Sequence, residues 1–415
     1  MPRLYEWSVD LGSGQRDASL EKFLAGTRRE VDLSTRIRAL QAQLVQSKEY
    51  ASHQGATVTP RPLWVVDVQT VTRQSAQGAE EVVPLLEEHV VQVRSSDRAS
   101  RVVGQGKRKE VWRGISLKGG AHTHHLFGLV TSRYVGKFSI LHRDLAYLPL
   151  IAVNGGFRVN HSLASRGRAQ KTLEAESADE SALHGWVRSA QARWEKGRKA
   201  DQQELVTERL DYQHGLQSQP ACSPRVVHTR SGNMYAALLR PGCEASTGVK
   251  LDKLTVKFRR GGRAVSSSER NLGGVVVDNL LHWIEVRTVQ EGYWLVGIMN
   301  SPPFISALGK EVQNRDFYSA PSRLLVSLGL RFDARNPTHV AIAEKAKMLE
   351  GFMAIYDRRV LEEELGSDQF ALVDDTDASP EIPRMKWSFD KLREENMECG
   401  QAYDRLSSLV AKLIA

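Results

Sequence analysis

The sequence has few cysteines and no long apolar run. Its 415 residues include only Cys222, Cys243 and Cys399. Three scattered thiols cannot form a disulfide framework or a four-ligand zinc site, which predicts a reducing compartment. No segment approaches the eighteen apolar residues of a membrane span, and the first residues lack the pattern of a signal peptide. We therefore expect a cytoplasmic protein without membrane contact.

Histidines form the densest group of candidate metal ligands. His122, His124 and His125 stand almost side by side, but no carboxylate or cysteine lies close to them in sequence. Histidines at a strand edge or turn are commoner than a metal site of this composition. The sequence therefore predicts no bound metal.

Positive charge is concentrated in one stretch of the chain. The net charge is +8, and residues 225–270 carry ten Lys and Arg against three acidic residues. Such a local excess indicates contact with phosphates. The chain after residue 360 is acidic instead, with Glu362–Glu364 and two aspartates at 374–375.

Hydrophobic periodicity divides the chain into parts of different character. Apolar residues at helical spacing dominate the first fifty residues, whereas short β-branched runs separated by turns follow. Strands are expected at 63–68, 82–86, 90–93, 111–117, 126–130, 225–228, 235–239, 254–258, 274–277 and 282–286. Helices are expected around Trp186 and at 291–300, 339–352 and 389–413.

These elements predict an α+β fold in five parts. We expect a helical N-terminal segment (1–50), a β-rich domain (60–160), a bridging helical segment (165–216), a second, mixed α/β domain (217–350) and an acidic helical tail (351–415). The bridging segment has Leu183, Trp186, Val187, Ala190 and Trp194 on one helical face.

An ordered set of phrases lies within the second domain. Glu291–Pro302 reads Glu-Gly-Tyr-Trp-Leu-Val-Gly-Ile-Met-Asn-Ser-Pro, and it is followed by Arg-Asp-Phe-Tyr at 315–318 and by Arg-Phe-Asp-Ala-Arg-Asn-Pro-Thr-His at 331–339. This order resembles the C-terminal target-recognition (specificity) region of adenine-specific DNA methyltransferases of restriction-modification and defence systems. The resemblance covers about residues 185–350.

The resemblance implies a module that grips double-stranded DNA and reads base edges while a catalytic domain extracts an adenine. Arg and Lys suit phosphates and guanine, Asn suits adenine, and Tyr fills space beside a distorted duplex. The candidate DNA-binding residues are Arg230, Lys257, Arg259, Arg260, Arg263, Arg270, Asn300, Arg315 and Tyr318. For each of them alone, an ordinary structural or surface role is the alternative.

Two short motifs imitate the catalytic signatures of the same enzymes. A glycine turn with Asp10, Gly12, Gly14 and then Asp32 imitates a site for S-adenosylmethionine. Ser301, Pro302, Pro303 and Phe304 imitate the turn that holds the target adenine. About 290 residues separate the two motifs without the alternating strand and helix rhythm of a doubly wound sheet, which argues against a catalytic domain in this chain.

The sequence therefore predicts a DNA target-recognition protein that binds no cofactor itself and works with a separate methyltransferase polypeptide that binds S-adenosylmethionine. The C-terminal helices, with Leu392, Met397, Tyr403, Leu406, Leu409 and Leu413, dock that partner or fold back onto their own domain. One alternative is a complete, divergent DNA adenine methyltransferase. Another is a non-enzymatic scaffold of a defence complex.

Overall fold

The computed structural model divides the chain into two compact units. Met1–Ala51 and Ser322–Leu330 form the first, and Ser52–Pro321 with Arg331–Ala415 form the second. The residues that the structure describes are 4–8, 27–31, 50–69, 71–74, 80–83, 89–96, 111–112, 114–164, 178–230, 233–260, 263–311, 320–376, 380, 382 and 389–414.

The first unit contains a two-stranded sheet. β1 (Leu4–Ser8) pairs antiparallel with β2 (Thr27–Val31). The prediction of a helical segment at 1–50 is thus wrong for these ten residues, where aromatic and β-branched side chains favour strands. The residues that carry the helical spacing lie outside the described part of the chain.

A six-stranded sheet forms the centre of the second unit, with strand order β17-β9-β10-β4-β7-β8. Neighbouring strands are antiparallel except for β17 and β9, which are parallel. The strands are β4 (Val65–Val68), β7 (Val90–Ser95), β8 (Lys118–His122), β9 (Leu126–Val130), β10 (Asp144–Tyr147) and β17 (Gly274–Val277).

The pairing of β17 with β9 changes the expected division into domains. It joins residues 274–277 to residues 126–130 in one sheet, so the regions expected as separate domains at 60–160 and 217–350 share a hydrogen-bonded ladder. Both regions also fall within the second compact unit. The boundary expected at 165–216 therefore does not separate two folded domains.

Smaller sheets complete the β structure of this unit. β14 (Ala236–Leu239), β13 (Arg225–Thr229), β18 (Leu281–Glu285) and β3 (Ser52–Gln54) form one antiparallel sheet in that order. β11 (Leu150–Val153) and β12 (Gly156–Val159) form a hairpin. Its turn places Asn154 and Gly155 at positive φ, the conformation that an Asn-Gly hairpin turn requires.

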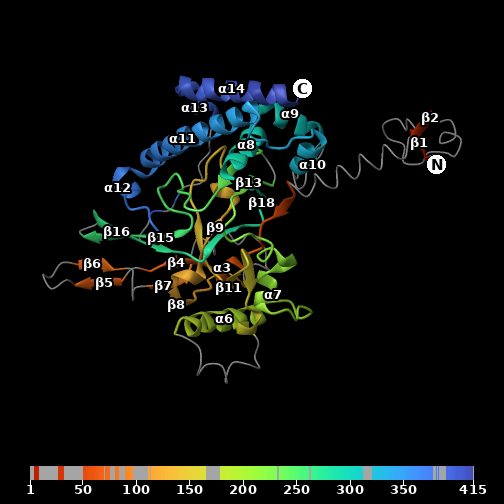
Figure 1. The fold of residues 1–415 in the computed structure, drawn as a ribbon. Coiled ribbons are helices and arrows are strands. Elements are labelled where there is room, and N and C mark those ends of the chain that lie inside the picture. Colours follow the sequence, from red (N-terminus) through yellow and green to blue (C-terminus); the bar gives the residue numbers. More distant parts are fainter. Residues whose placement is uncertain are drawn as a thin grey trace. The chain divides into compact units, whose positions relative to one another are not determined.

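A second four-stranded sheet has the order β16-β15-β6-β5. It contains β5 (Val71–Gln74), β6 (Glu80–Val83), β15 (Lys253–Arg260) and β16 (Arg263–Asn271). Figure 1 shows β15 and β16 side by side, next to β5 and β6. We call the β15–β16 hairpin the ribbon.

The helix α6 (Ala178–Gly197) lies against β8 of the central sheet. All five residues of its predicted apolar face are buried, which confirms that prediction. The indole Nε1 of Trp186 donates a hydrogen bond to the Leu63 carbonyl at 2.9 Å. This helix thus covers the core of one unit.

Helices cover the other side of the β structure, opposite α6 (Figure 1). They are α8 (Val289–Met299), α9 (Pro302–Glu311), α11 (Pro337–Leu365), α13 (Phe389–Glu395) and α14 (Met397–Ile414). α14 contacts α9 and α11, and Leu392, Tyr403 and Leu406 are buried, whereas Met397 is exposed. The C-terminal helices therefore fold back onto their own unit.

Local differences from the expected elements have local causes. Leu63 and Trp64, the first two residues of the strand expected at 63–68, belong instead to the short helix α3 (Arg61–Trp64), which begins after Pro60. The described residues of 111–117 contain no strand. The helix expected at 389–413 is interrupted at Asn396, whose side chain caps α14 by accepting the Cys399 amide at 2.9 Å. Among the described helices, none combines the length and apolar character of a membrane span.

Candidate nucleic-acid interface

The ribbon is a long antiparallel hairpin with an apolar root. Its strands pair from Lys253 opposite Asn271 to Arg260 opposite Arg263, with a β-bulge between Phe258 and Arg259. At the root, Leu254 and Val256 belong to the main hydrophobic core and are fully buried. The core therefore holds one end of the ribbon.

Positive charge follows the ribbon along its whole length. Residues 253–271 contain six Lys and Arg and one acidic residue, a net charge of +5. Arg259, Arg260 and Arg263 belong to the strand ends farthest from the root, although their side chains lie outside the described residues. A double-stranded ribbon of this sign has the dimensions to enter the major groove, which is about 12 Å wide.

The basic side chains that are described near the root are partly exposed. Lys250 and Lys253 both lie within 3.4 Å of Glu269, and the hydrogen bond from Lys250 lowers the pKa of that carboxyl. Lys257 donates to the Ala371 carbonyl at 2.9 Å, and Arg270 donates to the Ser268 hydroxyl at 2.9 Å. The partly exposed ion pairs of Lys250 and Lys253 with Glu269 stabilise the fold little, so these two lysines can exchange Glu269 for another anion at low cost.

The exposed part of β16 adds neutral hydrogen-bonding groups. Ser266, Ser267 and Asn271 are exposed on this edge strand. Hydroxyl and amide side chains serve both phosphate and base contacts in protein–DNA complexes. The same strand therefore offers cations for the backbone and polar groups for base edges.

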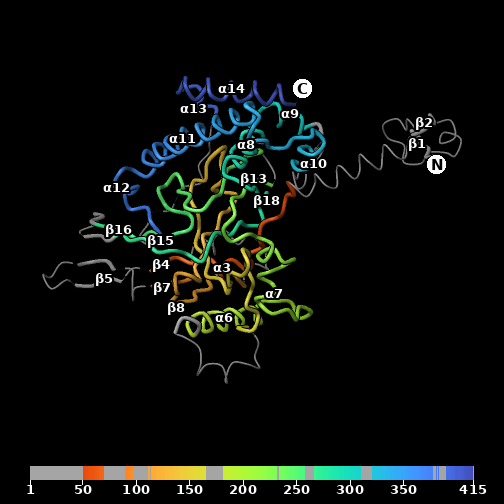
Figure 2. The backbone as a smooth tube through the Cα atoms, viewed as in Figure 1, coloured from red at the N-terminus to blue at the C-terminus, as the bar shows by residue number. Residues whose placement is uncertain are grey.

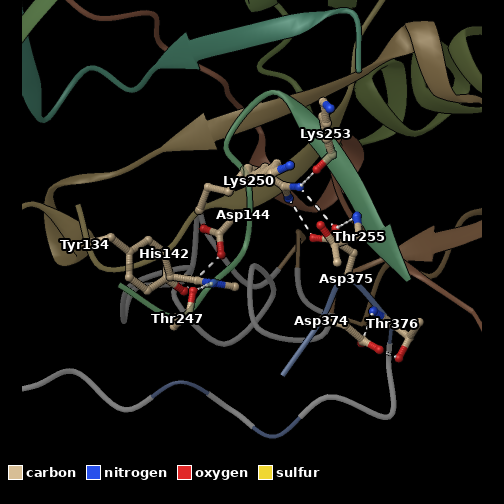
Figure 3. A network of polar contacts seen from close by, with 11 residues as sticks. Tyr134, His142, Asp144, Thr247, Lys250, Lys253, Thr255, Asp374, Asp375 and Thr376 are labelled. Carbon is tan, nitrogen blue, oxygen red and sulfur yellow. Dashed lines mark hydrogen bonds and ion pairs between the residues drawn. The ribbon is translucent and has the colours of Figure 1, made fainter. Parts of the chain in front are cut away.

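Beneath the ribbon lies a buried ion pair (Figure 3). The guanidinium of Arg143, which precedes β10, contacts both carboxylate oxygens of Asp375, at 2.7 and 3.1 Å. It also donates to the backbone carbonyls of Lys250, at 3.2 Å, and Lys253. Burial raises the pKa of the Asp375 carboxyl, whereas Arg143 and the Thr255 amide act in the opposite direction.

The acidic segment Asp374–Thr376 borders the root of β15. The Thr255 amide donates to Asp375 at 2.5 Å and the Lys257 amide donates to Asp374 at 3.2 Å. The Asp375 amide in turn donates to the Thr255 carbonyl at 3.1 Å. Thr376 forms a bridge with Val68 of β4, so one short segment joins the ribbon to the central sheet.

A hollow of about 300 Å³ opens beside the first residue pair of the ribbon. Asp252 and Asn271 line it, together with Arg225 and Arg240. Arg225 is buried, and its described contacts are the neutral oxygens of Gln219, at 3.1 Å, and Val275, at 2.8 Å. Burial lowers the pKa of Arg225 to about 10, so the side chain is charged at neutral pH. The hollow therefore adds positive charge next to the ribbon root.

Asn300 is placed differently from the other predicted DNA-binding residues. Its side chain is completely buried, accepts the Ala236 amide at 3.0 Å and donates to the Ala236 carbonyl at 2.7 Å. Because both ends of the amide are occupied inside the fold, its prediction as a DNA contact is wrong for this conformation. Asn300 instead ties the end of α8 to β14.

The remaining predicted residues are not all gathered at the ribbon. Arg230 lies just after β13, and its amide donates to the Leu280 carbonyl at 3.3 Å. Arg315 and Tyr318 lie outside the described residues. Of the nine predicted residues, the structure therefore brings together the five between Lys257 and Arg270.

The surroundings of the two motifs that imitate catalytic signatures do not suit a catalytic domain. Ser301 and Phe304 are completely buried at the start of α9, and the Ser301 hydroxyl donates to the Ile298 carbonyl at 2.6 Å. A target base cannot stack on a ring in the core. Asp10, Gly12, Gly14 and Asp32 lie outside the described residues. The strands before and after the glycine turn, β1 and β2, are antiparallel, unlike the parallel strands of a doubly wound cofactor domain.

The described residues contain no group of three or more His, Cys, Asp or Glu side chains arranged to hold a metal ion. The ring of His124 contacts the rings of His122 and His125, with centroids 4.9 and 4.0 Å apart.

No protein-family model matches the chain, and no curated protein is significantly similar to it in sequence.

Proposed function

We propose that this protein binds double-stranded DNA through the ribbon and serves as the target-recognition component of an adenine-specific DNA methylation or phage-defence system. The observation that carries the proposal is the net charge of +5 on the β15–β16 hairpin, whose root is fixed in the core. β-ribbons are an established means of reading a DNA groove. The hollow that Arg225 and Arg240 line places further positive charge near the root.

The catalytic step belongs to a separate polypeptide in this proposal. The buried Ser301 and Phe304 have no access to a base, and the antiparallel pairing of β1 with β2 does not resemble a cofactor-binding sheet. The partner polypeptide supplies S-adenosylmethionine and extracts the adenine. Incubation of the purified chain with labelled S-adenosylmethionine and mixed-sequence DNA should leave the DNA unlabelled; labelled DNA would instead establish a complete methyltransferase.

Duplex binding is tested by fluorescence anisotropy across a range of salt concentrations. We expect the logarithm of the association constant to fall linearly with the logarithm of salt concentration, because each neutralised phosphate releases counterions. Substitution of Arg259, Arg260 and Arg263 by serine should reduce the magnitude of this slope by up to about 3, roughly one for each lost contact.

A matched control removes the same charge elsewhere. Arg188, Arg193 and Lys196 are exposed on α6, away from the ribbon, and their replacement by serine also removes three positive charges. This variant should keep the wild-type slope. Equal loss of affinity and slope in both variants would show that net charge alone causes binding, and the absence of salt-dependent binding by the wild-type chain would reject the proposal.

A further inference from the structure

We propose that the buried Arg143–Asp375 pair is a positioning device that holds the ribbon at the angle needed for DNA. This inference rests on the proposed function, because it concerns the orientation of the same hairpin. Both side chains are buried, with side-chain exposures of 0% and 3%. The pair therefore acts on DNA only through the ribbon.

The geometry connects the pair to successive residues of the ribbon root. Arg143 donates to the carbonyls of Lys250 and Lys253, and Asp375 accepts the Thr255 amide. Gly128 of β9 leaves the space for this arrangement: a Cβ atom there would lie 2.7 Å from the Arg143 Cδ and 2.2 Å from the Leu251 carbonyl oxygen. Figure 3 shows the Asp375 carboxylate beside Thr255, whose amide donates to it.

On the side of β15 opposite β16, no strand of the described residues pairs with the root of the ribbon. β6 pairs with β15 only at Arg259 and Arg260. Between the root and that point, the edge of β15 is occupied by the segment around Asp374 and Asp375. Figure 2 traces this segment as the continuation of the chain after α12 (Ser367–Phe370). Side-chain contacts from the C-terminal region, instead of a continuous ladder, therefore set the direction of the ribbon root.

Loss of the pair should loosen the ribbon without removing an exposed charge. Ordering a loosened ribbon on DNA reduces affinity, whereas the number of phosphates contacted in the complex stays the same. For Arg143→Lys and Asp375→Asn we expect a roughly tenfold increase in Kd at every salt concentration, with an unchanged salt slope. The amides of Thr255 and Lys257 should exchange hydrogen faster than in the wild type.

The two substitutions differ in severity, so at least one variant remains interpretable. Arg143→Lys keeps the positive charge and loses the two-pronged geometry, whereas Asp375→Asn removes the negative charge with little change in volume. Asp357→Asn is the matched control, because it alters another buried aspartate, which lies on α11 and accepts hydrogen bonds from Ser139 and Ser246 rather than from the ribbon. It should leave Kd, slope and ribbon exchange unchanged.

The outcomes separate the inference from the proposed function. If the wild-type chain binds DNA and both folded pair variants bind it with a Kd within twofold of the wild-type value, the positioning role is overturned and the proposed function stands. A reduced salt slope in these variants also overturns it, because that result means lost phosphate contacts. Absence of DNA binding by the wild-type chain rejects the proposed function and this inference with it.

Discussion

The ribbon root and the helical layer each contain a buried aspartate, and the two carboxyl groups have different hydrogen-bond and charge partners. Asp375 at the root meets the Arg143 guanidinium and a backbone amide. Asp357 on α11 accepts hydrogen bonds from the hydroxyls of Ser139 and Ser246, both 2.8 Å from its Oδ2, and its Oδ1 has no hydrogen-bond partner among the described residues. Burial raises the pKa of Asp357 to about 7.

The two sites compensate a buried carboxyl group in different ways. A buried carboxylate requires a cation and hydrogen-bond donors, or it takes up a proton instead. At the root of the ribbon, the Asp375 carboxylate is paired with the Arg143 guanidinium. In the helical layer, the Asp357 carboxyl group has no such cation and ionises near neutral pH. We therefore expect the two sites to respond differently to mutation and to pH.

The largest effect should come from breaking the ion pair at the root. Arg143→Met leaves Asp375 buried without a counter-charge, which typically destabilises a protein by about 3–5 kcal/mol. Urea unfolding at pH 8, followed by circular dichroism, measures the free energy of unfolding. A loss below about 1 kcal/mol would mean that water or a protonated Asp375 replaces the pair.

The next largest effect should be the pH dependence caused by Asp357. Its folded-state pKa of about 7 exceeds the ordinary value of 3.8, so its stabilising contribution is complete below pH 4 and is lost as the pH rises through 7. At 1.36 kcal/mol per pKa unit, this loss is about 4 kcal/mol.

Comparison with Asp357→Asn isolates this group from the other titrating side chains. The free energy of unfolding of the variant relative to wild type should increase between pH 4 and pH 8, and the variant should be the more stable protein at pH 8. Urea unfolding at several pH values provides the measurement. A difference that does not vary with pH would contradict the raised pKa.

The sequence was sufficient for elements whose pattern is local. The strands expected at 126–130 and 274–277 are confirmed residue for residue, because each is a short apolar run bounded by turns. Polar Ser266–Ser268 concealed β16, whose partner β15 was expected at 254–258. The apolar face of α6 followed from its periodicity, whereas the parallel pairing of β17 with β9 has no local signal.

The candidate site shows the same limit. The basic residues of 257–270 were visible as a charge excess, and the aspartates at 374–375 as an acidic segment. Arg143 has no comparable signal, because it stands between His142 and Asp144 in an otherwise apolar stretch. Its partner Asp375 lies 232 residues away, so only the fold reveals the pair. Asn300 fitted the family phrase, but the pattern gave no information about its burial.

The smallest predicted effect concerns one hydroxyl at the unpaired aspartate. The Ser139 hydroxyl lowers the pKa of Asp357 from the higher value that burial alone would produce. Ser139→Ala should destabilise the protein by about 1 kcal/mol at pH 8, where it removes a hydrogen bond to a buried carboxylate, and by less at pH 5. Because the substitution also raises the pKa of Asp357, the loss of stability caused by ionisation of Asp357 should continue to a higher pH than in the wild type.

Ser189→Ala on the exposed side of α6 is the control, because it removes a hydroxyl that donates to the Gly185 carbonyl and not to a carboxylate. Equal effects of Ser139→Ala at pH 5 and pH 8 would show that its hydroxyl does not respond to ionisation of Asp357.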